Sequence, residues 1–137
     1  MMAKSCVTTN KGYNSEFCLE SYMFNVPSVT YIQCIARLRL SSHNLNIELG
    51  RHAKPKLPVA DRLCSRCSLG AVDNECHFLI DCTAFSNERA ILFGQLQSDL
   101  PGFISLDSYD KFVSIMSSKC QNVNFQLSKF LHKCLPK

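Results

Sequence analysis

The sequence predicts a mainly α-helical fold, a small helical domain stapled by a loop of Cys and His residues. Its 137 residues include only 5 Gly and 5 Pro, and 46% are hydrophobic, which favours helices around a buried core. Apolar residues recur at helical spacing in several stretches. One short segment, residues 61–83, also gathers four Cys and one His. Together these features predict helices packed beside a metal-binding loop.

The first two of four predicted helices flank that loop. We expect one over about residues 28–41, capped by Ser28, with an apolar stripe of Val29, Ile32, Ala36 and Leu40. The other spans about 84–98, begins at Thr83 or Ser86 and ends before Pro101-Gly102. Its inner face is formed by Phe85, Leu92 and Leu96.

The last two predicted helices show the clearest periodicity. The first covers about 107–118 and has its apolar face at Tyr109, Phe112, Val113 and Met116. The second covers about 122–134, with Asn122 as cap and an apolar face of Val123, Leu127, Phe130, Leu131 and Cys134. We therefore expect these two helices to contribute much of the core.

The remaining segments are less regular. Residues 1–27 show no firm period and form an N-terminal extension before the domain at 28–137. Leu45, Ile47 and Leu49 alternate with polar residues, which predicts a short extended segment ending at Gly50. Residues 51–58 read as a basic, extended linker, because residues before proline disfavour helix.

The stretch from 61 to 83 carries the chemistry. Cys64, Cys67, His77 and Cys82 are separated by two, nine and four residues, a full ligand set for one tetrahedral Zn2+. Four protein ligands leave no open position, so the predicted zinc is structural, in a Cys3His loop similar to a zinc knuckle. Asp73 is the expected cap of a helical turn that carries His77.

Alternatives to this ligand set remain open. Cys76 competes with His77 as a ligand, or the four residues are unconnected. Disulfides are a further possibility for a chain with nine Cys, although the N-terminus lacks the apolar region of a secretory signal. We expect an intracellular protein of the nucleus or cytoplasm, with no membrane partner. Cys34 and Cys134 are expected in the core.

The net charge of +4 is distributed unevenly along the chain. Residues 37–67 hold seven Lys or Arg against two acids, whereas residues 68–107 hold six acids against one Arg. The positive charge nearest the metal loop consists of Arg51, Lys54, Lys56, Arg62 and Arg66. Such a stretch predicts contacts to nucleic-acid phosphates, or else a solvated face.

Five segments together resemble a known family. They are Arg37-Leu-Arg-Leu40, His43-Asn-Leu-Asn-Ile-Glu-Leu-Gly-Arg51, Pro55-Lys-Leu-Pro58, Arg62-Leu-Cys-Ser-Arg-Cys67 and Asn74-Glu-Cys-His-Phe-Leu-Ile-Asp-Cys82. They resemble the C-terminal zinc-binding segment of non-LTR (LINE-type) retrotransposon reverse transcriptases. The later segments Phe112-Val-Ser-Ile-Met-Ser117 and Lys129-Phe-Leu131 fit the tail of such proteins, so the resemblance covers about residues 30–134. Cys76 departs from the family, which usually has an ordinary or aromatic residue there.

The resemblance implies zinc ligation by Cys64, Cys67, His77 and Cys82, and partners that include RNA, DNA and a reverse-transcriptase domain. The polymerase motif Tyr/Phe-x-Asp-Asp is absent, and the chain has no Asp-Asp pair, so we expect no catalytic residues and no enzyme activity. The expected function is a non-catalytic tail that binds RNA or DNA through phosphate contacts. One alternative is a structural or protein-interaction module that docks on a polymerase domain through an apolar helix face or through an acidic face of Asp73, Glu75, Asp81 and Glu88. The other is a non-functional element fragment.

Overall fold

The computed structural model describes residues 22–136, so most of the predicted N-terminal extension lies outside the described residues. Five longer helices and several short ones make up this part of the chain. The helices are α1 (Tyr22–Asn25), α2 (Val29–Arg39), α3 (Asn46–His52), η1 (Val59–Asp61), η2 (His77–Asp81), η3 (Thr83–Phe85), α4 (Ser86–Leu96), η4 (Phe103–Ser105), α5 (Ser108–Ser117) and α6 (Gln121–Cys134). The described residues form no β-strand, only a bridge between Leu63 and Val72. The prediction of a mainly α fold is thus confirmed.

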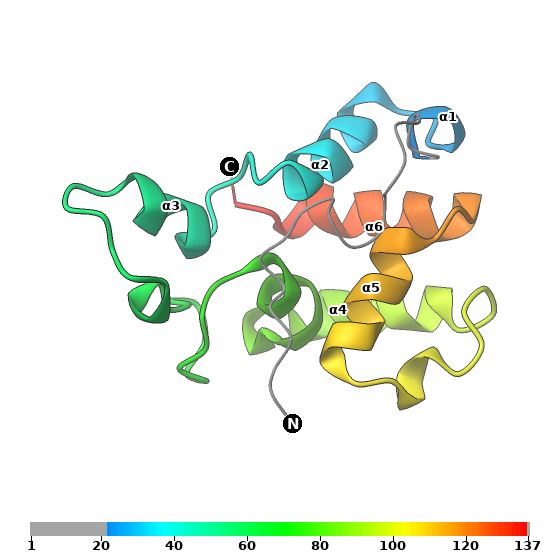
Figure 1. The fold of residues 1–137 in the computed structure, drawn as a ribbon. Coiled ribbons are helices and arrows are strands. Elements are labelled where there is room, and N and C mark those ends of the chain that lie inside the picture. Colours follow the sequence, from blue (N-terminus) through cyan, green and yellow to red (C-terminus); the bar gives the residue numbers. More distant parts are fainter. Residues whose placement is uncertain (1–21, 137) are drawn as a thin grey trace.

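Helix α6 is the centre of the core. It packs against α1, α2, α4 and α5, and in Figure 1 α2 lies above it and α4 below. Its predicted apolar face is fully buried, with Phe130 against the rings of Phe78 and Phe85. The core begins before the predicted boundary at residue 27, because Tyr22 and Val26 are buried in it. No helix within residues 22–136 is both long enough and apolar enough to cross a bilayer.

The segment from α3 through η1, residues 46–61, is called the arm here. It extends to one side of the helical body, at the left of Figure 1. The extended segment predicted at 45–49 is wrong, because α3 occupies most of it. The N–H groups at the N-terminus of α3 find acceptors far away in the sequence. The Asn46 N–H donates to the Asp73 carboxylate at 2.8 Å, and the Ile47 N–H donates to the Asp73 carbonyl.

Gly50 therefore lies inside a helix and does not end a strand. The side chain of Arg62 crosses directly over it. A Cβ at Gly50 would stand 2.5 Å from Cγ of Arg62, so the close approach requires a residue without a side chain. This contact fixes the arm against the start of the metal loop.

The predicted stripe of α2 is also wrong at both ends. Ser28 caps the helix as expected, accepting from the Tyr31 N–H. Val29 and Leu40, however, are exposed, and the buried residues are Cys34, Ile35, Leu38 and Arg39. The stripe was misplaced because Arg39 turns inwards, donates to the Met116 carbonyl of α5 and lies over the Tyr22 ring.

The start of α6 differs from the prediction in its N-cap residue. Its N-cap position is Cys120, not Asn122. The Asn122 amide instead donates to the Asp99 carboxylate at 2.6 Å, which ties the first turn of α6 to the chain after α4. The predicted inner face of α4 is confirmed at Leu92 and Leu96.

Candidate metal centre

Cys64, Cys67, His77 and Cys82 meet at one point of the structure. Their ligand atoms all lie within 4.8 Å of one another. The sulfurs of Cys64 and Cys82 are 3.8 Å apart, and the Cys67 sulfur is 3.4 Å from Nε2 of His77. A cluster of three thiols and one imidazole at these separations can hold one metal ion.

A short hairpin-like turn presents the first two cysteines. The Cys64 N–H donates to the Ala71 carbonyl at 2.9 Å, beside the bridge between Leu63 and Val72. Gly70 takes a left-handed conformation with φ of 66°, which closes the turn. The backbone N–H of Leu69 points at the Cys67 sulfur and lowers the pKa of that thiol. The turn therefore favours the thiolate, the form that binds metals.

The other two ligands lie at the ends of the π-helical turn η2. His77 begins it and Cys82 follows it, and the Cys82 N–H donates to the His77 carbonyl at 2.7 Å. Asn74, not Asp73, caps the turn by accepting from the His77 N–H at 2.9 Å. This five-residue π-helical turn brings both side chains to the same cluster, and π-helical turns are frequent at functional sites.

Arg89 holds the C-terminal end of this turn, and sequence patterns gave no signal for it. Its guanidinium, buried on α4, donates to the carbonyls of Phe78, Leu79 and Cys82 at 2.9, 2.9 and 2.6 Å. These carbonyls lie where the turn ends, and the Cys82 carbonyl also accepts from the Phe85 N–H at 3.3 Å. Burial lowers the pKa of Arg89, although guanidinium remains charged in proteins. Arg89 is thus a buried structural cation that positions the main chain at Cys82, one of the four candidate metal ligands.

Burial also determines the resting state of the ligands. Cys82 is 0% exposed, and desolvation raises the pKa of its thiol to about 11. Desolvation likewise lowers the pKa of His77, which keeps the imidazole neutral. A neutral imidazole is ready to bind a metal, whereas the Cys82 thiol must release a proton on metal binding.

Cys76 is not part of the cluster, and the alternative that it replaces His77 is wrong. Its sulfur lies 3.8 Å from the Ser108 carbonyl at the start of α5, and the side chain is buried in the core. Adjacent residues in this turn face different directions, so only His77 reaches the other ligands. Cys34 and Cys134 are buried in the core as predicted, and the described cysteines form no disulfides.

Asp73 links the metal loop to the arm. Its fully buried carboxylate accepts from the Asn46 N–H and from the Arg66 guanidinium, the latter at 2.5 Å. Glu75 is buried as well. The acidic docking face expected from Asp73, Glu75, Asp81 and Glu88 is therefore wrong, since two of its four carboxylates are inside the protein.

The five predicted phosphate-binding cations fall into two groups. Arg51, Lys54 and Lys56 are exposed on the arm, and Arg51 pairs with Glu48 at 3.3 Å. Arg62 is only 4% exposed and donates to the carbonyls of Ile47 and Leu57. Arg66 pairs with Asp73 and lies 5.6 Å from the centre of the Phe85 ring. The prediction is thus wrong for Arg62, whose donors are used by the main chain.

A second cluster of polar side chains lies at the end of α2. His43 is buried, and its Nε2 lies 2.9 Å from Oε1 of Glu75, which also accepts from the Ser41 hydroxyl. The Leu45 N–H donates to Nδ1 of His43, which places the ring proton on Nε2. In a hydrolase triad the imidazole lies between the hydroxyl and the carboxylate. Here the Glu75 carboxylate lies between the Ser41 hydroxyl and the His43 imidazole, so the order differs from that of a triad. The cluster therefore holds the loop at 41–45.

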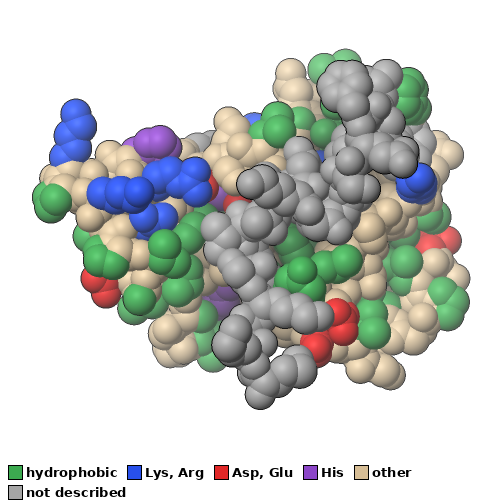
Figure 2. Space-filling view, in the orientation of Figure 1, with side chains coloured by type: hydrophobic (Ala, Val, Ile, Leu, Met, Phe, Trp, Pro, Cys, Tyr) green, Lys and Arg blue, Asp and Glu red, His purple; other side chains and the backbone are tan. Residues whose placement is uncertain are grey.

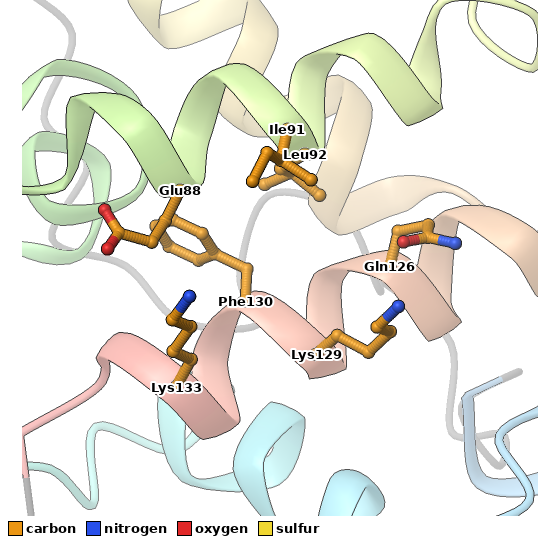
Figure 3. Close-up of a pocket in the computed structure, with 7 residues that line it drawn as sticks. All are labelled: Glu88, Ile91, Leu92, Gln126, Lys129, Phe130 and Lys133. Atoms are coloured by element: carbon orange, nitrogen blue, oxygen red, sulfur yellow. The ribbon is translucent and has the colours of Figure 1, made fainter.

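A hollow of about 160 Å3 lies between α4 and α6, and Figure 3 shows the side chains that line it. Leu92 and Phe130 form its apolar floor, and Glu88, Lys129 and Lys133 line its rim. This volume is below that of typical small-molecule sites, about 300–1,000 Å3. The two lysines are exposed and lie on the helical body, so they provide a control surface for the cations of the arm.

The comparisons with known proteins return no matching family model, no similar curated protein and no similar solved structure. The resemblance to a reverse-transcriptase segment stays a prediction from the sequence motifs.

Proposed function

We propose that this chain is a structural zinc module that binds RNA or DNA through phosphate contacts made by its arm. In this proposal it is the non-catalytic, zinc-binding tail of a non-LTR retrotransposon reverse transcriptase. The observation that carries it is the arm itself, three exposed cations held in place by the metal loop.

The ligand geometry supports zinc as the metal. Bonds of about 2.3 Å to sulfur and about 2.0–2.1 Å to nitrogen give a tetrahedron with edges of about 3.8 Å between sulfurs and about 3.6 Å between sulfur and nitrogen. In the structure the Cys64 and Cys82 sulfurs are 3.8 Å apart and the Cys67 sulfur is 3.4 Å from Nε2 of His77, and all six separations lie within 4.8 Å. Three thiolates and one imidazole also suit zinc by ligand type. The four protein ligands complete its coordination, so the ion organises the chain and carries no substrate.

The arm supports phosphate binding because its cations are exposed. Figure 2 shows Lys and Arg side chains gathered over the arm, at the left of the molecule. Arg51, Lys54 and Lys56 are exposed there. Arg62 donates to the carbonyls of Ile47 and Leu57, which precede and follow Arg51, Lys54 and Lys56 in the sequence, and so it holds this segment of the arm in place. Through Arg62, the segment that carries these exposed cations is thereby connected to the start of the metal loop.

The test is binding of a duplex and of a single strand at several salt concentrations. Three phosphate contacts predict that log K falls with log salt with a slope of about 2–3. Arg51→Gln, Lys54→Gln and Lys56→Gln together should reduce that slope towards zero. The matched control is Lys111→Gln, Lys129→Gln and Lys133→Gln, which removes the same charge from α5 and α6 and should preserve the slope. Equal losses in the two triple variants would contradict a specific role of the arm.

Exposed apolar residues favour a second candidate function, docking on another protein domain. Leu57, Val59, Leu63 and Leu69 are each more than two-fifths exposed and belong to the arm and the metal loop. These four lie within thirteen residues of the sequence, and contiguous exposed apolar groups mark interaction surfaces more often than isolated ones do. Leu57→Ser and Leu63→Ser would weaken docking on a polymerase domain and leave the salt slope of nucleic-acid binding unchanged.

A further inference from the structure

A polar hollow between α2 and α3 adjoins the arm. Its volume is about 480 Å3, within the range of small-molecule sites. Its lining includes Arg37 and Leu40 from the end of α2, Asn44 from the connecting loop, and Leu49 and His52 from α3. The hollow thus opens beside the same helix that carries Arg51.

The loop that forms one wall is held in a fixed conformation. Ser41 has a φ of 55°, a left-handed conformation that is unfavourable for Ser and needs support from its surroundings. That support comes from Glu75, which accepts from the Ser41 hydroxyl and contacts the buried His43. Since Glu75 lies two residues before the metal ligand His77, the wall is tied to the metal loop. The hollow is therefore formed before any ligand arrives, which lowers the entropy cost of binding.

The polar groups at the hollow remain available to a ligand. Nε of Arg37 donates to the Ser42 carbonyl at 3.1 Å, which orients the guanidinium. Its two terminal nitrogens remain able to donate to a ligand. Asn44 and His52 are exposed, and neither side chain has a hydrogen-bond partner within residues 22–136. The acid at this site, Glu48, is buried and paired with Arg51. The hollow consequently offers donors, an amide and positive charge.

The hollow also has exposed apolar side chains beside these polar groups. Leu40 is 64% exposed and Leu49 is 49% exposed, both at the hollow. A nucleobase needs this combination: an apolar or planar surface for its face, an amide for its edge, and a cation for the neighbouring phosphate. An Asn amide presents a donor and an acceptor side by side, which matches the edge of a base. Guanidinium planes also stack on unpaired bases.

We propose that this hollow takes one unpaired nucleobase, so that the arm binds single-stranded nucleic acid in preference to duplex. The inference rests on the phosphate binding proposed above and adds its substrate class. In a duplex the base is stacked and paired, and entering the hollow costs a few kcal/mol of unpairing. A single strand turns a base outwards at much lower cost.

The experiment compares a 12-nucleotide single strand with a duplex of equal phosphate number, at one salt concentration, on the metal-loaded protein. The single strand should bind about tenfold more tightly. Asn44→Ala should reduce that preference about fivefold, in line with the loss of one base-edge contact. Asn87→Ala is the matched control, an exposed Asn on α4 outside the hollow, and should keep the preference. A strand carrying photoreactive bromouracil should crosslink within residues 37–52.

The outcomes separate the two proposals. Equal binding of the two probes, lost in the arm triple variant, overturns the nucleobase site and leaves the phosphate-binding arm standing. A single-strand preference that Asn44→Ala does not change, with crosslinks outside residues 37–52, also overturns it. If neither probe binds at low salt, the phosphate-binding function fails and the nucleobase site with it.

Discussion

Arg89→Met removes the cation that holds the turn between His77 and Cys82. Methionine keeps the apolar stem but leaves the carbonyls of Phe78, Leu79 and Cys82 without their donor. Each hydrogen bond to a charged group contributes about 1.5–3 kcal/mol. Removing a buried charge also removes its desolvation cost, which offsets part of that loss. The expected net loss in the free energy of unfolding is about 3 kcal/mol, which is less than the sum of three such bonds because of this offset.

The assay is urea unfolding of the zinc-loaded protein, followed by circular dichroism. Arg89→Met should lower the midpoint without changing the dependence on denaturant. Arg37→Met is the control, because its one side-chain bond, to the Ser42 carbonyl, is exposed; its effect should stay below about 1 kcal/mol. An Arg89→Met protein as stable as the wild type would refute the role given to this guanidinium.

Other changes test the metal loop and the arm. Cys76→Ser should keep one metal ion per chain by native mass spectrometry, because the Cys76 sulfur faces Ser108. Gly50→Ala should lower the unfolding free energy by about 1–3 kcal/mol in the same urea assay, because its methyl group meets Arg62. Metal affinity from competitive titration should rise between about pH 6 and 8, because protons compete for the thiolates and the pKa of Cys82 is raised to about 11. A flat pH profile would contradict thiolate ligation.

The sequence was sufficient where the determining interactions are local. The apolar faces of α4 and α6 follow from spacings of three and four residues, which place side chains on one side of a helix. The metal cluster was predictable for a similar reason, since the identities and spacing of Cys64, Cys67, His77 and Cys82 express their chemistry directly. Helical periodicity therefore predicted most of the helical body, and the spacing of the Cys and His residues predicted the candidate site.

Residues whose role depends on distant partners were not predictable. The sequence of helix α3 alternates between apolar and polar residues, which predicts a strand. The hydrogen bond that stabilises its N-terminus comes from Asp73, 27 residues away from Asn46, and has no local pattern. Arg62 and Arg89 read as surface charge, yet both are buried, with their donors on main-chain carbonyls of irregular segments. Neither position carries a local pattern that distinguishes a buried cation from a solvated one. The same holds for the buried pair of His43 and Glu75, which only the folded loop brings together.

The central claim is that one zinc ion at Cys64, Cys67, His77 and Cys82 holds the loop and, through it, the arm. The most direct measurement combines native mass spectrometry with amide hydrogen exchange, before and after chelation. We predict one zinc per chain in the purified protein and none in the Cys67→Ser variant. Chelation should remove exchange protection from residues 62–82 while the core of α6 keeps more of it. A metal-free protein with full protection across residues 62–82 would contradict the account.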